Sequence, residues 1–138
     1  MKRLGTAICI AGAAWLASVA PARATPLTVG NTPVRFALKR GFHPSSAGRT
    51  LPLVYRVTYG GCERAPPPFA GYVLVWARHR LTVTLLLRPA ARPAPGIICP
   101  DVAWVAHLET RIALPHALGA RALYDGATKP PRLVHASG

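Results

Sequence analysis

Proline is spread along almost the whole chain and leaves few windows in which a helix could form. Beyond residue 24 it occupies positions 26, 33, 44, 52, 66, 67, 68, 89, 93, 95, 100, 115, 130 and 131. Each proline lacks a backbone N–H and restricts the residue before it to extended conformations. We therefore expect the chain to fold mainly as strands and turns.

The clearest strand patterns lie between these prolines. Residues 53–59 are rich in β-branched and aromatic side chains, which favour strands. Residues 72–76 are apolar on both faces, as is typical of a central strand, and residues 80–88 alternate between polar and apolar. The two segments predict a β-hairpin with its turn at Arg78-His79. Its second strand would direct inward Leu81, Val83, Leu85 and Leu87.

The segment 102–114 alternates most regularly of all. One face would carry Trp104, Ala106, Leu108, Thr110, Ile112 and Leu114, and the other Val105, His107, Glu109, Arg111 and Ala113. A helix over the same residues is the alternative interpretation. The period of two fits a strand better, and Pro100 and Pro115 bracket it.

Weaker patterns complete the predicted fold. Short strands are expected at 27–29, 34–38 and 121–124, with loops at 39–50 and 89–100 and a turn at Asp125-Gly126. Six or seven short strands with turns about ten residues apart predict an all-β fold. The expected architecture is a small antiparallel β-sandwich, immunoglobulin-like in its arrangement, with one disulfide.

The N-terminus has the pattern of a secretory signal peptide. Lys2 and Arg3 precede an apolar stretch from Ile8 to Ala20, and Ala22-Arg23-Ala24 fits a small-x-small cleavage site. We expect residues 1–24 to be a signal peptide that is removed, which predicts a secreted or periplasmic protein. An uncleaved anchor is the alternative, but the apolar stretch is shorter than the ~20 residues that span a bilayer. A single domain over 25–128 and a flexible tail over 129–138 would follow.

Two of the three cysteines lie beyond the signal peptide, namely Cys62 and Cys99. An exported protein passes through an oxidising compartment, so this even number predicts a Cys62–Cys99 disulfide. A redox or metal site is the alternative. It is disfavoured because neither cysteine has a second cysteine two or three residues away.

The chain is strongly basic, with 17 Lys and Arg against 4 Asp and Glu. Without residues 1–24 the balance is 14 against 4, a net charge of +10 that would attract polyanions. The candidate anion-binding residues surround the predicted hairpin and are Arg78, Arg80, Arg88 and Arg92. The alternative is a compositional bias without a dedicated site, since the basic residues are nearly all arginine.

Catalytic and metal-binding patterns are lacking. The serines beyond residue 24 are Ser45, Ser46 and Ser137, and no Gly-x-Ser-x-Gly motif is present. The acids are Glu63, Asp101, Glu109 and Asp125, with no credible catalytic pair; Glu109 would form a surface ion-pair row with His107 and Arg111. The five histidines are scattered. We expect no catalytic residue, no metal site and no cofactor.

Several motifs together resemble small secreted β-rich proteins of bacteria, often lipoproteins, whose function is unknown. These motifs are Tyr59-Gly-Gly-Cys62, Leu81-Thr-Val-Thr-Leu85, Cys99-Pro100, Leu114-Pro-His-Ala-Leu-Gly-Ala-Arg121 and Asp125-Gly-Ala-Thr128. The resemblance covers residues 53–128. It implies a strand-rich domain with a Cys62–Cys99 bridge and export to the envelope. The chain departs from the group in lacking a lipobox and in being strongly basic.

These observations predict an exported, non-enzymatic β-sandwich protein of the bacterial cell envelope or periplasm, acting as a binding or structural module. Its candidate partners are an anionic envelope polymer or another protein. One alternative is a basic polyanion-binding protein. Another is a secreted enzyme inhibitor that presents loop 63–70 or loop 89–98, the first of which is stiffened by three prolines. No segment beyond the signal peptide is apolar and long enough to span a membrane.

Overall fold

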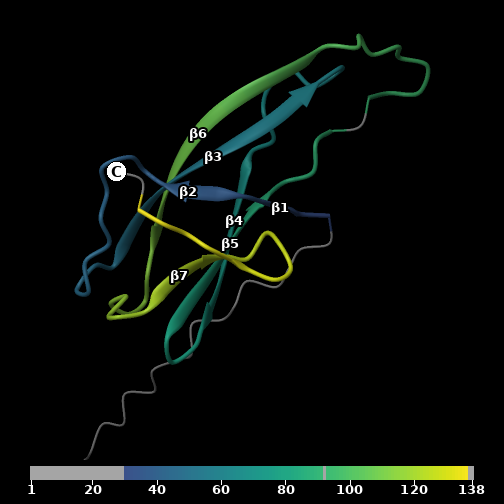
Figure 1. The fold of residues 1–138 in the computed structure, drawn as a ribbon. Coiled ribbons are helices and arrows are strands. Elements are labelled where there is room, and N and C mark those ends of the chain that lie inside the picture. Colours follow the sequence, from purple (N-terminus) through teal and green to yellow (C-terminus); the bar gives the residue numbers. More distant parts are fainter. Residues whose placement is uncertain (1–29, 92, 137–138) are drawn as a thin grey trace, which may run out of the picture.

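The computed structural model describes residues 30–91 and 93–136, which form strands and no helix (Figure 1). The strands are β1 (Thr32–Val34), β2 (Phe36–Leu38), β3 (Thr50–Gly60), β4 (Phe69–Trp76), β5 (Arg80–Leu87), β6 (Ala103–Ala113), β7 (Ala122–Asp125) and β8 (Arg132–Leu133). They form two packed sheets, so the expected all-β sandwich with one disulfide is confirmed. The predicted signal peptide and the predicted strand at 27–29 lie outside the described residues.

The five-stranded sheet is built around β5. The predicted β4–β5 hairpin is confirmed, with Trp76 opposite Leu81. The other edge of β5 is shared: β1 pairs with residues 85–87, and β7 pairs with residues 80–83. The β5–β7 pair is parallel, which the antiparallel expectation missed. Because the chain crosses to β6 in the other sheet before it returns as β7, this connection is long enough for β7 to run in the same direction as β5.

The three-stranded sheet has the order β2-β3-β6. β3 and β6 pair without a break along their full length, from Thr50 opposite Ala113 to Gly60 opposite Ala103. Pro52 is tolerated inside β3 because β2 ends at Leu38, before it reaches this proline. The Pro52 carbonyl still accepts the N–H of Lys39 (3.0 Å).

The expected strand at 34–38 is two strands in different sheets. β1 ends at Val34 and pairs with β5, whereas β2 begins at Phe36 and pairs with β3. Arg35 is therefore the point at which the chain passes from one sheet to the other. Each of these strands has only three residues, which is too few for a pattern of alternation that would distinguish two strands from one in the sequence.

The core lies between the sheets and follows the predicted alternation. Its most buried side chains are Leu38, Leu51, Leu53, Leu81, Val83, Leu85 and Ile112. β5 departs from the expected pattern, because Thr82 and Leu86 on its other face are also buried. β5 is thus the central strand of its sheet. β4, which was expected to be central, pairs with β5 alone among the described strands and leaves Val75 exposed.

Two further expectations are corrected. The segment expected to be a flexible tail contains β8, which pairs with β7, and Val134 N–H donates to the Leu123 carbonyl (2.9 Å). Trp104 lies on the inner face of β6 but is 57% exposed.

Candidate functional site

The outer face of the three-stranded sheet gathers basic side chains from separate strands. Arg56 of β3 lies opposite His107 of β6. Because Phe36 is opposite Tyr55, Arg35 extends the same row on the β2 side. Arg35, Arg56 and His107 are all exposed. Three cationic or ionisable groups thus follow one line across the sheet.

A fourth basic residue reaches this row from the other sheet. Arg132 of β8 pairs with Asp125 of β7, and the Asp125 carboxylate accepts the N–H of Phe36 at the start of β2 (3.4 Å). This contact places β8 beside the row. Arg35, Arg56, His107 and Arg132 line one open groove of about 270 Å³ together with Phe36, Ala37, Val54 and Tyr55, and most of its surface is apolar. We call this site the basic groove.

The carboxylates do not line the basic groove, although Glu109 lies opposite its lining residue Val54. No Asp or Glu is among the residues that line it. Glu109 lies one row further along the sheet and pairs with Lys39 (2.8 Å), rather than with His107 and Arg111 as expected. Lys39 directly follows β2, and its N–H bonds to the carbonyl of Pro52 on β3. Pro52 lies opposite Arg111 of β6, so Lys39 lies in the row next to Glu109 and its side chain reaches the Glu109 carboxylate. In the described part of the chain, this is the one ion pair formed.

The other three carboxylates lie elsewhere. Glu63 is held by the backbone of Gly60, Asp125 is fully buried, and Asp101 is exposed on the connection that leads into β6. Within the described residues the four basic side chains of the groove form no ion pair, so an anionic ligand can approach them without breaking one.

The arginines predicted as an anion site are not brought together. Arg78 and Arg80 are exposed at the turn of the β4–β5 hairpin, and Arg88 follows the far end of β5. A strand rises about 3.3 Å per residue, so Arg80 and Arg88 are separated by roughly 26 Å. Arg92 lies outside the described residues. These arginines are close in the sequence, but the extended strand β5 lies between Arg80 and Arg88 and keeps them apart in space.

A cluster that sequence reasoning missed lies beside the hairpin turn. The Arg121 guanidinium covers the Trp76 ring (5.4 Å to the centroid), and its Nε donates to the Ala77 carbonyl (3.1 Å). His116 meets the same ring edge-on (5.8 Å). These contacts fix the connection between β6 and β7 to the hairpin, so the cluster supports the fold.

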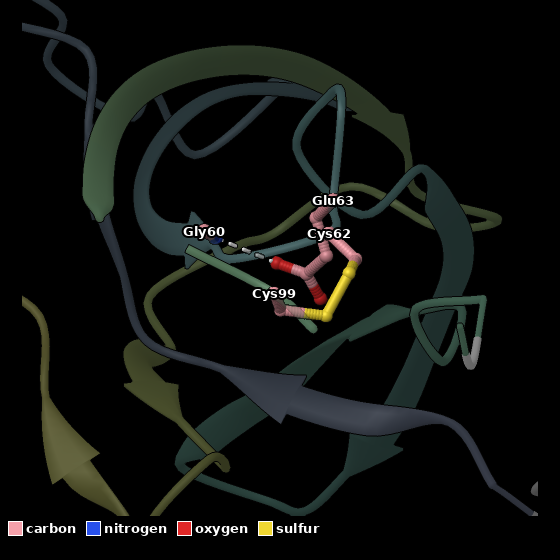
Figure 2. Close-up of a disulfide and its surroundings, with 4 residues drawn as sticks. All are labelled: Gly60, Cys62, Glu63 and Cys99. Carbon is pink, nitrogen blue, oxygen red and sulfur yellow. Dashed lines mark hydrogen bonds between the residues drawn. A yellow bond between two sulfur atoms is a disulfide. The ribbon is translucent and has the colours of Figure 1, made fainter. Parts of the chain in front are cut away.

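The predicted disulfide is present between Cys62 and Cys99, whose Cα atoms are 5.0 Å apart. Cys62 lies within a turn in which the Glu63 N–H donates to the Gly60 carbonyl (3.1 Å). The Glu63 carboxylate accepts the Gly60 N–H (2.9 Å) in the same turn (Figure 2). Glycine is required here. A Cβ at Gly60 would collide with the Val102 carbonyl, and Gly61 has φ +64°.

The disulfide fastens the long β5–β6 connection to the end of β3. A bridge of this kind is typical of proteins that fold in an oxidising compartment outside the cytoplasm. None of the described segments forms a helix long and apolar enough to cross a membrane.

Groups that could hold a metal ion do not gather in the described part of the chain. Within residues 30–91 and 93–136, no three His, Cys, Asp or Glu side chains lie close enough to hold a metal ion. Burial raises the pKa of Tyr55 above its usual value, but this side chain belongs to the core. The basic groove brings together basic side chains that lie far apart in the sequence.

Comparison with protein-family models, with curated proteins and with solved structures found no match to this chain. The resemblance carried by residues 53–128 stays a prediction.

Proposed function

We propose that the protein is an exported, non-enzymatic binding module of the bacterial envelope or periplasm, and that the basic groove binds an anionic polymer. The observation that carries the proposal is the convergence of Arg35, Arg56, Arg132 and His107 on one groove whose lining residues include no carboxylate. These side chains come from different strands of a rigid scaffold. Their convergence is therefore a property of the folded domain rather than of local composition.

The chemistry of arginine supports this assignment. Each guanidinium presents planar donors that match phosphate, sulfate or carboxylate oxygens, and it stays charged at any physiological pH. Binding to a polyanion releases condensed counterions, so affinity falls steeply as salt rises. Residues held by β-strand pairing lose less conformational entropy on binding than residues on a mobile loop. The groove can therefore bind a repeating anion without rearrangement.

The experiment compares the groove with the hairpin turn, which carries matched charges. A fluorescent heparin oligosaccharide is titrated with the wild-type protein and with two double variants, Arg56→Gln/Arg132→Gln and Arg78→Gln/Arg80→Gln. Each pair removes two exposed arginines. We expect the groove variant to bind at least about tenfold more weakly, with a shallower dependence of log affinity on log salt. The hairpin variant should lose only a few-fold in affinity.

Equal losses in the two variants would show that the charge acts diffusely and would overturn the assignment of the groove. Failure of the wild-type protein to bind the oligosaccharide at about 0.1 M salt would overturn polyanion binding itself. Unchanged thermal unfolding of both variants is the control for folding, because all four side chains are exposed.

A further inference from the structure

β6, one of the two outer strands of the three-stranded sheet, has an open edge. Among the described strands, β6 pairs with β3 alone. Leu114 N–H donates to the Arg49 carbonyl (2.7 Å), and Val102 accepts the N–H of Gly61 (2.9 Å). Since bonded residues alternate along an antiparallel pair, the even-numbered residues of this strand bond to β3. The odd-numbered residues direct their N–H and C=O groups away from the sheet.

One end of this edge is already occupied. The Tyr72 hydroxyl of β4 donates to the Ala113 carbonyl (2.9 Å), which agrees with the outward direction of odd-numbered residues. This contact closes the edge at the C-terminal end of β6. From Ala103 to Arg111, the described residues provide no backbone partner.

β6 carries the charged residues Glu109 and Arg111 but lacks the other usual features that keep an edge strand from pairing. Natural edges are protected by proline, lysine, bulges or short length. This strand contains no proline or lysine, extends over 11 residues and keeps an unbroken register with β3. The edge strand β4 differs, because a bulge interrupts it between Phe69 and Gly71 and three prolines precede it. The contrast singles out β6 as the edge that can accept a strand.

The side chains of β6 are complementary to those of an identical strand. If two copies pair antiparallel with Leu108 opposite Leu108, then His107 of each copy lies opposite Glu109 of the other. The partly exposed Val105 lies opposite the aliphatic part of Arg111. Moving the register by two residues would place His107 opposite His107 or Glu109 opposite Glu109, which is unfavourable. The charges therefore disfavour the two symmetric registers that differ from this one by two residues.

We propose that the protein forms a homodimer in which the β6 edges of two copies pair antiparallel and join the two three-stranded sheets into one. In this register the bonded positions are Val105, His107, Glu109 and Arg111, so Ala113 keeps its bond to Tyr72. The interface is isologous and leaves no new free edge on β6, so association stops at two copies. The proposal does not depend on the ligand of the basic groove.

The test uses the exported chain in sedimentation equilibrium over a wide range of protein concentration. Salt of about 0.15 M limits repulsion between the two basic copies, because the screening length is then about 8 Å. The wild type should be in monomer–dimer equilibrium. His107→Pro removes an N–H that points away from β3, so it should abolish the dimer and leave the monomer folded. His107→Ala keeps this N–H and should weaken the dimer by less than about tenfold.

A second variant serves if His107→Pro does not fold. Val105→Lys keeps every backbone donor but places a lysine opposite Arg111, so it should weaken the dimer at least about tenfold. A wild-type protein that is monomeric at every concentration overturns the proposal. So does a dimer that forms equally well in Val105→Lys and in the wild type.

Discussion

The Asp125 carboxylate on β7 accepts the backbone N–H of Phe36 on β2 (3.4 Å), and this bond links the two sheets. Lys39 N–H bonds to β3, so odd-numbered residues of β2 face β3 and the Phe36 N–H points away from it. The other carboxylate oxygen accepts the Ala127 N–H (2.9 Å). Asp125 is 0% exposed, and its carboxylate satisfies the buried N–H of Phe36 and the partly buried N–H of Ala127.

Asp125→Ala should therefore destabilise the domain by about 2–4 kcal/mol, because two donors lose their acceptor and each buried unpaired group costs about 1–3 kcal/mol. Urea unfolding followed by tryptophan fluorescence measures the change. Asp101→Ala is the matched control, since this carboxylate is exposed and should change stability by less than about 0.5 kcal/mol. Equal effects of the two substitutions would contradict the role of Asp125.

The disulfide should contribute a large part of the stability of so small a domain. Cys62 and Cys99 are 37 residues apart, and a loop of this length corresponds to about 4 kcal/mol on the chain-entropy model. The double substitution Cys62→Ala/Cys99→Ala should lower the free energy of unfolding by about this amount. Chemical reduction of the wild type should give the same loss. A stability unchanged by reduction would show that the core alone determines it.

Sequence patterns predicted the strands whose residues alternate over a long stretch. β6 was recognised from its period of two, and β5 from its inward leucines and valine, because burial of one face of a strand leaves a direct record in the sequence. The Cys62–Cys99 bridge followed from the cysteine count and the expected compartment. The alternation of a strand is a local property of the sequence, and two cysteines allow only one intramolecular pairing.

Features that depend on which strands are neighbours could not be predicted in this way. The parallel β5–β7 pair and the passage between sheets at Arg35 are properties of topology. The basic groove brings together Arg35 and Arg132, which lie near opposite ends of the described chain. Each arginine appeared isolated in the sequence. The hairpin arginines appeared clustered but are separated by the length of β5.

The cation–π contact of Arg121 gives a test of the cluster at the hairpin turn. Arg121→Ala would remove the stacking on Trp76 and the hydrogen bonds to the carbonyls of Ala77 and Leu118. We expect a loss of about 1.5–3 kcal/mol, since each of the three interactions contributes about 0.5–1 kcal/mol where it is partly exposed. Arg78→Ala removes the same charge from the exposed turn and is the control. If both variants unfold at the same urea concentration, the cluster is not structural.

Stability should fall in alkali because of Tyr55. Burial raises the pKa of this hydroxyl above the ordinary value of 10.0, so the folded state binds the phenolic proton more tightly than the unfolded chain. The resulting stabilisation is complete below pH 10 and is lost as the pH rises through the folded-state pKa.

Tyr55→Phe removes this contribution. The free energy of unfolding should therefore decrease less between about pH 8 and pH 11 in the variant than in the wild type. An alkaline titration followed by phenolate absorbance should show that the folded variant has one fewer tyrosine that ionises above the usual pH range than the folded wild type. Identical pH dependence in the two proteins would contradict this role of Tyr55.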